Sequence, residues 1–138
     1  MKKILALSLL TFISCKKDNN TVQQQYNYTG KWNISQSISK EYTLENGDTI
    51  YTKNEVTDYG AGTAWIDFQS EYALMYLNYS LDSMTYKPIT QSYFNLDSTL
   101  CEITAFSDSA FLFNTLIFDN TTIPDKILVK QDFFTLSK

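Results

Sequence analysis

From residue 26 onward, hydrophobic and polar positions alternate in short runs, which is typical of strands with one buried face. The clearest run places Trp32, Ile34 and Ile38 on one parity, with polar residues between them. Asn46 and Gly47 follow this run, and such a pair predicts a type I′ hairpin because both positions need a positive φ. The pattern therefore predicts a strand that runs on to residue 44 and a return strand over residues 49–59.

Runs rich in β-branched and aromatic residues continue to the C-terminus, separated by turn-forming residues at intervals of about eight to twelve positions. The run 72–79 is apolar on both parities, so a helix is an alternative there, although its tyrosines and its neighbours favour a strand. The sequence predicts an all-β fold of about eight strands, as in a sandwich or a barrel. The further strands are expected over residues 64–69, 72–79, 84–87, 93–96, 100–106, 110–118 and 126–136.

The first fifteen residues have the pattern of a bacterial lipoprotein signal. Lys2 and Lys3 precede a mostly apolar run of roughly ten residues, about half of the ~20 that a membrane-spanning helix needs. Residues 12–15, Phe-Ile-Ser-Cys, resemble the lipobox of bacterial lipoproteins, in which the cysteine takes a diacylglyceryl group and becomes the first residue. We expect residues 1–14 to be removed as a signal peptide and Cys15 to carry the lipid. An ordinary secretory signal cut nearby is the alternative.

The residues that follow Cys15 are polar and low in complexity. We expect residues 15–27 to form a tether after the lipidated Cys15, and residues 28–138 to form a single domain. Cleavage before Cys15 leaves nine lysines against fifteen acids, and the chain has neither Arg nor His. The acidic balance argues against nucleic acid as a partner, and the lack of Arg argues against anionic ligands.

Gly30-Lys31-Trp32 at the start of the first strand, followed by about eight strands, resembles bacterial lipocalin-like lipoproteins. Residues 103–106, 111–113 and 135–136 add to the resemblance, which covers roughly residues 28–138. It implies a lipocalin-like, up-and-down antiparallel β-barrel of about eight strands, which closes its own edges and has room for one small ligand at most. It also implies that Trp32 plugs the closed end. Lipocalins usually pack an Arg over this Trp, and this chain has none.

The side chains that point into such a barrel are expected to fill most of it, because several of them are large aromatics. Short strands make a shallow cup, so a ligand is expected near the open end, in contact with tyrosines. The ten tyrosines of the chain can equally reflect strand propensity and core packing. The expected inward residues are Ile34, Ile38, Ile66, Phe68, Met75, Leu77, Ile103, Phe111 and Phe113. The expected ligand-lining residues are Tyr42, Tyr51, Tyr59, Trp65 and Tyr76.

Residues that usually carry catalysis or bind metals are scarce in this sequence. Without a His beside it, Cys101 has no obvious base, and we interpret it as a small buried hydrophobe. Asp67 and Glu102 are the mid-strand carboxylates that acid–base chemistry would need, but most acids fall in turns or on the wet face of strands. Residues 18–20 and 119–120 lack the ligand spacing of a calcium loop. We therefore expect no enzyme activity, no metal and no cofactor.

Four Asp-Ser or Asp-Thr pairs near predicted turns resemble acceptor sequences of periplasmic O-glycosylation in some Gram-negative bacteria. Turn formation is the simpler interpretation, because Asp and Ser favour turns through local hydrogen bonds. The acceptors would be Thr49, Ser83, Ser98 and Ser109.

The sequence as a whole predicts a lipoprotein of the bacterial cell envelope, in the outer membrane of a Gram-negative bacterium, on its periplasmic side or exposed at the surface. The leading hypothesis is a barrel that binds a small apolar or amphipathic ligand. The alternative is an interaction module that binds a protein or a glycan through exposed tyrosines. An internal cavity would favour the first hypothesis, and an exposed aromatic patch would favour the second.

Overall fold

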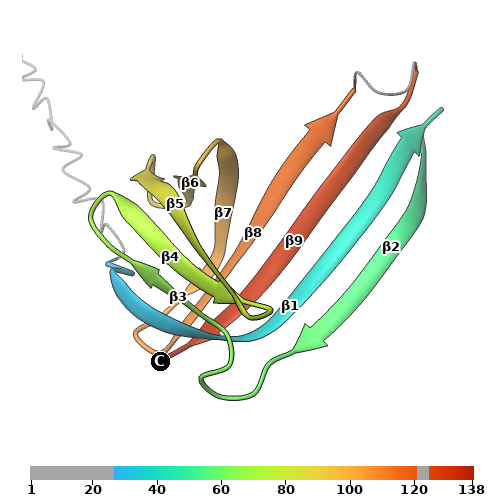
Figure 1. Ribbon diagram of the computed structural model, residues 1–138. Helices are drawn as coiled ribbons and strands as arrows, with labels where there is room; N and C mark the ends of the chain where they lie inside the picture. Colours follow the sequence, from blue (N-terminus) through green and yellow to red (C-terminus); the bar gives the residue numbers. More distant parts are fainter. Residues whose placement is uncertain (1–26, 121–124) are drawn as a thin grey trace, which may run out of the picture.

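The computed structural model describes residues 27–120 and 125–138, which contain nine strands and no helix. The strands form one antiparallel sheet in the order β2-β1-β3-β4-β5-β6-β7-β8-β9, and β1 also pairs with β9. This pairing closes eight strands into an up-and-down barrel and leaves β2 as an extra strand (Figure 1), so the predicted fold class is confirmed. The strands are β1 (Gly30–Glu45), β2 (Asp48–Asp58), β3 (Trp65–Phe68), β4 (Tyr72–Leu77), β5 (Ser80–Pro88), β6 (Tyr93–Leu96), β7 (Thr99–Phe106), β8 (Ala110–Asp119) and β9 (Ile127–Ser137).

The hairpin between β1 and β2 turns at Asn46 and Gly47, as the sequence predicts. Both residues have a positive φ, 51° and 87°, which is the requirement of a type I′ turn. The segment that could have been a helix is the strand β4, paired on both sides with β3 and β5.

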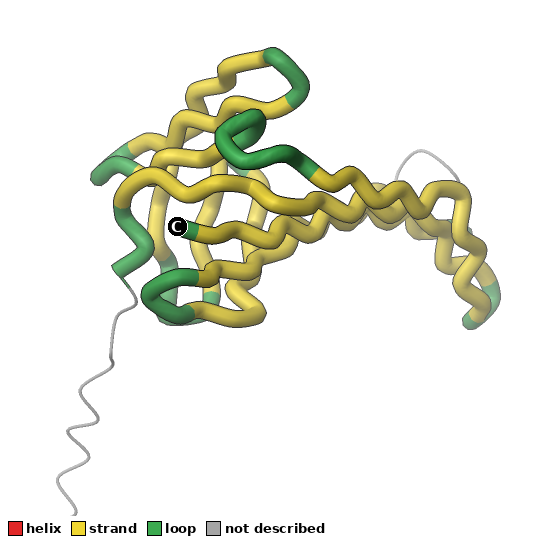
Figure 2. The backbone as a smooth tube through the Cα atoms, turned by 90° about the horizontal axis from the view of Figure 1, so that it is seen from below, coloured by secondary structure: helices red, strands yellow, loops and turns green. Residues whose placement is uncertain are grey.

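The length of β1 gives the molecule its shape. Its first residues, 30–33, pair with β3 and belong to the barrel wall, whereas residues 36–45 pair with β2 along the same edge. On its other edge β1 pairs with β9 over residues 33–44. Four long strands therefore run out beyond the barrel as a single layer (Figures 1 and 2). We call this layer the extension; it comprises residues 36–45 of β1, 48–58 of β2, 127–133 of β9 and 115–119 of β8.

Trp32 lies fully buried in the barrel core, as predicted. Its indole Nε1 donates a hydrogen bond to the Tyr28 carbonyl oxygen at 2.8 Å, and the rings of Phe106 and Phe111 pack edge-on against it. The Nζ atom of Lys138 lies 4.5 Å from the centroid of the Trp32 ring. A lysine at the C-terminus therefore places a cation over the Trp32 ring.

Most of the residues that the sequence predicts to point into the barrel do so. Ile34, Ile66, Phe68, Phe111 and Phe113 are buried in the core. Three more residues of the predicted set are partly buried and pack against that core: Met75, Leu77 and Ile103. The sequence did not single out Tyr28, Phe94, Leu96 and Leu136, which complete the aromatic and aliphatic packing of the interior.

The inward position predicted for Ile38 is wrong, and a β-bulge explains the error. Ile34 pairs with Leu136, but Gln36 pairs with Thr135, so Ser35 is an extra residue in β1. A shift of one residue moves every following side chain to the opposite face of the sheet. Ile38 consequently shares the outer face with its partner Phe133.

The two faces of the extension have opposite character. The inner face, which continues the barrel interior, carries mostly polar and charged side chains, and the outer face carries mostly apolar ones. The inner face includes Ser37, Ser39, Glu41, Lys53, Glu55, Lys130 and Asp132. The outer face includes Ile38, Tyr42, Leu44, Tyr51, Val56, Leu116, Phe118, Ile127, Val129 and Phe133.

Candidate functional site

The barrel interior is packed with side chains, so it offers no large internal site. Phe68, Phe94, Phe111 and Phe113 are all buried, with ring centroids 5.2–6.5 Å apart in the pairs that touch. Tyr28 enters the same cluster and contacts five aromatic rings. Burial raises the pKa of the Tyr28 hydroxyl, and the interaction with Tyr86 lowers it in part. In the described part of the chain, the candidate binding sites are therefore hollows that open to solvent.

One such hollow lies at the barrel mouth, where the interior meets the inner face of the extension. It has a volume of about 220 Å³, below the usual range of ligand pockets, about 300–1,000 Å³. Its floor is apolar, with Met75, Met84 and Phe134, and its rim carries Asp97 and Asp132. This hollow is small, and its carboxylates make it a poor site for a purely apolar molecule.

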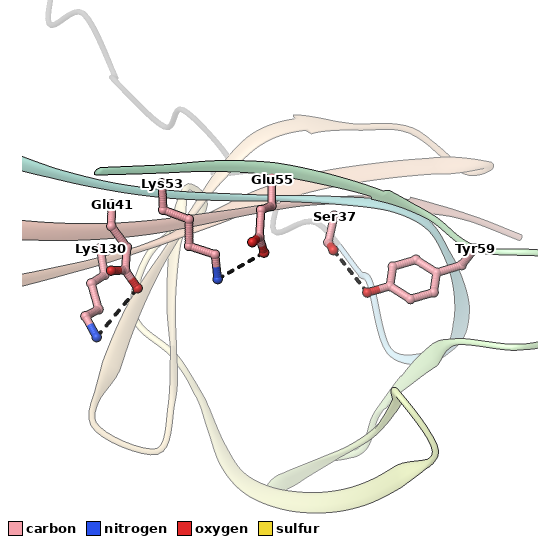
Figure 3. Close-up of polar contacts among 6 residues, drawn as sticks. All are labelled: Ser37, Glu41, Lys53, Glu55, Tyr59 and Lys130. Carbon is pink, nitrogen blue, oxygen red and sulfur yellow. Dashed lines mark hydrogen bonds and ion pairs between the residues drawn. The ribbon is translucent and has the colours of Figure 1, made fainter. Parts of the chain in front are cut away.

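The inner face above this mouth carries two ion pairs. Lys130 Nζ lies 3.7 Å from a carboxylate oxygen of Glu41, and Lys53 Nζ lies 3.2 Å from one of Glu55. Figure 3 shows these four side chains on one side of the strands, on the same side as Ser37. The hydrogen bond to Glu55 raises the pKa of Lys53, and the charges of Glu55, Glu41 and Asp132 add to this rise. Alternating charges of this kind favour solvation of the face over capture of a single-sign ligand.

A larger hollow, of about 370 Å³, lies between the β2–β3 loop and the β4–β5 turn. We call it the tyrosine hollow. Its volume falls within the range of small-molecule sites. None of its lining residues carries a charge, and half of them are tyrosines. The lining residues are Tyr59, Gly62, Thr63, Tyr76, Asn78 and Tyr79.

The position of Tyr59 at one wall of the tyrosine hollow is fixed by β1. Its backbone N–H donates to the Ser35 carbonyl oxygen at 2.9 Å, and its hydroxyl lies 3.1 Å from Ser37 Oγ (Figure 3). Ser35 is the bulged residue, so the irregularity in β1 helps to anchor the segment that leaves β2. The loop beyond is held by Thr63, whose hydroxyl donates to the Gly60 carbonyl oxygen at 2.7 Å.

Tyr76 at the opposite wall is fixed by a stack of side chains on the outside of the barrel. Its ring lies on that of Trp65, with centroids 5.9 Å apart and an interplanar angle of 21°. Lys31 Nζ covers the Trp65 ring at 3.9 Å from its centroid. The stack orders Tyr76 before any ligand arrives, which lowers the entropic cost of binding.

Tyr79 is the least protected of the three tyrosines. It is 95% exposed at the tip of the β4–β5 turn, and both Asn78 and Tyr79 have a positive φ, 52° and 66°. Asn suits this conformation, but a bulky residue at positive φ is an outlier. A two-residue hairpin of type I′ needs a positive φ at both central positions, so the turn between Leu77 and Ser80 holds Tyr79 in this conformation.

The ligand-lining residues predicted from the sequence do not all come together. Tyr59 and Tyr76 line the tyrosine hollow, and Trp65 lies behind Tyr76 in the stack. Tyr42 and Tyr51 lie against each other on the outer face of the extension, with ring centroids 5.3 Å apart.

Tyr79 was not among the predicted ligand-lining residues, because the sequence signal for its turn is weak. The pair Asn78-Tyr79 stands between two apolar runs at the spacing of a two-residue hairpin. A turn with Asn in its first position is a hairpin signal, but a Gly normally follows.

The four candidate acceptors of O-glycosylation are all exposed. Thr49 lies near the start of β2 and Ser83 within β5, so both sit in strands. Ser98 lies in the β6–β7 turn and Ser109 in the bend before β8.

The side chains considered for catalysis do not form a common site, and each makes local contacts of its own. Burial raises the pKa of Cys101 to about 12, so this buried thiol is protonated at neutral pH. Asp67 accepts a hydrogen bond from Gln69 Nε2 at 2.7 Å, and Glu102 accepts one from the Tyr93 hydroxyl at 3.4 Å. Among the described residues, no three Cys, Asp or Glu side chains come close enough together to hold a metal ion.

Cys15, the signal peptide and most of the tether lie outside the described residues. In the described part of the chain no helix is long and apolar enough to cross a membrane. No model of a known protein family, no curated protein and no solved structure matches this chain. A function has to be inferred from the chain's own residues.

Proposed function

We propose that this chain is a lipocalin-like lipoprotein, anchored through Cys15 in the outer membrane of a Gram-negative bacterium, that binds a small, neutral, amphipathic ligand in the tyrosine hollow. It acts as a binding protein and not as an enzyme. The observation that carries the proposal is the meeting of Tyr59, Tyr76 and Tyr79 around one hollow of about 370 Å³. The lipobox-like residues 12–15 support the anchor.

The lining of the hollow indicates the chemistry of the ligand. Tyrosine rings offer flat apolar surfaces, and their hydroxyls, together with Asn78 and Thr63, offer hydrogen bonds. A molecule with both apolar faces and hydroxyl groups, such as a sugar or a glycolipid headgroup, satisfies both. Because no charged side chain lines the hollow, a charged ligand would lose hydration without gaining an ion pair.

The proposal is tested by titrating the chain from Lys16 onward with octyl glucoside, a neutral amphiphile, below its micelle concentration. Binding is followed by calorimetry and by tryptophan fluorescence, because Trp65 stacks on Tyr76. We expect Tyr79→Ala to weaken binding at least about tenfold, or about 1.4 kcal/mol, since it removes one of the three tyrosine rings that line the hollow.

Tyr51→Ala is the matched control, because Tyr51 is also an exposed tyrosine but lies on the extension. It should bind as the wild type does. Palmitate, an anionic amphiphile, should bind more weakly than octyl glucoside. Equal affinity of the wild type and Tyr79→Ala, or the absence of binding by the wild type, would contradict the proposal.

A second candidate function, an interaction module, is favoured by one observation. The outer face of the extension exposes several large apolar side chains, among them Tyr51, Val56 and Phe118. Exposed apolar patches of this kind mark interaction sites on soluble domains.

A further inference from the structure

The extension is a single layer of sheet with one apolar face. A sheet with an apolar face is stable when that face is covered by another layer. Here the inner face is solvated and ion-paired, while Tyr51, Val56 and Phe118 on the outer face are 62%, 57% and 61% exposed. Val129, in the middle of this face, is buried outside the barrel core. The outer face therefore has the composition of half of a sheet-on-sheet core.

We propose that a second copy of this chain packs on the outer face, so that two extensions form a two-layered sandwich around a two-fold axis. Facing sheets in such sandwiches lie about 10 Å apart with their strands roughly aligned. A two-fold axis places the same surface on both sides, which is the commonest symmetry of soluble homo-oligomers. This inference does not depend on the tyrosine hollow.

The area of the face fits this occupant. The four strand segments of the face contain 10, 11, 7 and 5 residues, which at about 3.4 Å per residue and about 4.8 Å between strands give a face of about 540 Å². Two such faces bury about 1,100 Å², just above the ~1,000 Å² that a specific interface needs. The charge of the face fits as well. In its middle the register places one charged side chain, Lys40, whose Nζ lies 5.0 Å from the centroid of the Phe133 ring on the same face.

Two other occupants fit less well. The tether, residues 15–27, is polar after Cys15 except for Val22 and Tyr26, so it has little apolar surface with which to cover the face. A lipid bilayer with anionic headgroups attracts clusters of Lys and Arg, and the face offers Lys40 on a chain of net charge −4. A second copy meets neither difficulty.

The inference is tested by sedimentation equilibrium of the chain from Lys16 onward, whose whole core lies within residues 28–136. We expect a dimer at micromolar concentration. Phe118→Glu and Tyr51→Glu should each raise the dissociation constant at least about tenfold, because each places a charge in the apolar interface. The chain neighbours provide matched controls: Ile117→Glu and Ile50→Glu alter similarly exposed residues of the inner face and should remain dimeric.

Every other outcome overturns the inference. A wild type that stays monomeric at 100 µM would do so. A dimer that Tyr51→Glu disrupts and Phe118→Glu does not would indicate pairing through the free edge of β2 instead. Binding of the unanchored chain to phosphatidylethanolamine–phosphatidylglycerol vesicles, lost in Phe118→Glu, would assign the face to the membrane.

Discussion

Trp32 and Trp65 lie on opposite sides of the same wall of the barrel. Trp32 pairs with Ile66 and points into the core, whereas Trp65 is one residue out of phase and stacks outside on Tyr76. The same residue type therefore stabilises the fold at one position and shapes the surface at the other.

We predict that Trp32→Ala destabilises the domain by about 3–5 kcal/mol, the usual cost of an aromatic-to-alanine change in a core. Trp65→Ala is the control and should cost about 1 kcal/mol, because it removes a ring stack and a cation contact at a partly exposed site. Urea unfolding measures both. Similar losses for the two variants would mean that Trp32 does not anchor the core.

The buried thiol of Cys101 makes stability depend on alkaline pH. Its pKa is raised to about 12 in the folded protein, while the unfolded thiol titrates near 9.0. The thiol therefore contributes its full stabilisation below pH 9, and this contribution is lost as the pH rises toward 12. We predict that the free energy of unfolding falls over this window and that it falls less steeply in Cys101→Ala. Identical slopes would show that the thiol is accessible to water.

At the scale of residues, the sequence predicted the core better than the site. Trp32, Phe111 and Phe113 stand in alternating runs, and burial follows directly from alternation. The hollow brings Tyr59 of the β2–β3 loop together with Tyr79 of the β4–β5 turn, because β3 and β4 pair antiparallel and these two connections lie at the same end of the pair. The path of the β2–β3 loop has no local sequence signature from which this meeting could be predicted.

The hairpin of β1 and β2, in contrast, could be predicted from a local sequence pattern. Asn46-Gly47 predicts the turn because few other pairs tolerate two positive φ angles. The bulge at Ser35 could not be predicted in this way, since a serine fits a regular strand as well as a bulge. The parity error at Ile38, and with it the apolar outer face of the extension, follows from this one extra residue.

The turn supports a prediction at the scale of elements. Gly47→Ala should destabilise the domain by about 1–2 kcal/mol, because an L side chain is strained at a φ of +87°, although the new Cβ would meet no other atom within 4 Å. Gly60→Ala is the control: its φ is unstrained, and its new Cβ would lie 3.6 Å from Thr63 Cγ2, an ordinary contact. Its effect should stay within about 0.5 kcal/mol. Thermal unfolding of the two variants makes the comparison, and equal effects would argue against the type I′ turn.

At the scale of the whole molecule, the proposed anchor and the two surfaces have separate roles. The tyrosine hollow lies between the β2–β3 loop and the β4–β5 turn of the barrel, and the extension presents its apolar face away from the barrel interior. An N-terminal lipid would hold both at the membrane through the polar tether, residues 15–27.

The anchor gives a prediction of its own. Cys15→Ser should abolish labelling by radioactive palmitate and release the chain from membranes into the soluble fraction, because the serine cannot take the thioether-linked lipid. Ser14→Ala, which keeps a small residue before the cysteine, should still be labelled. Palmitate incorporation in Cys15→Ser would place the anchor elsewhere.

The most direct test of the proposed function is native mass spectrometry of residues 16–138, exported to the periplasm by an ordinary secretory signal and purified without detergent. We predict a mass excess on the wild type from a small neutral molecule. The excess should persist in Tyr51→Ala and disappear in Tyr76→Ala/Tyr79→Ala, which removes two of the three rings of the hollow. A wild type that carries no excess mass, or a double variant that retains it, would contradict ligand binding in the tyrosine hollow.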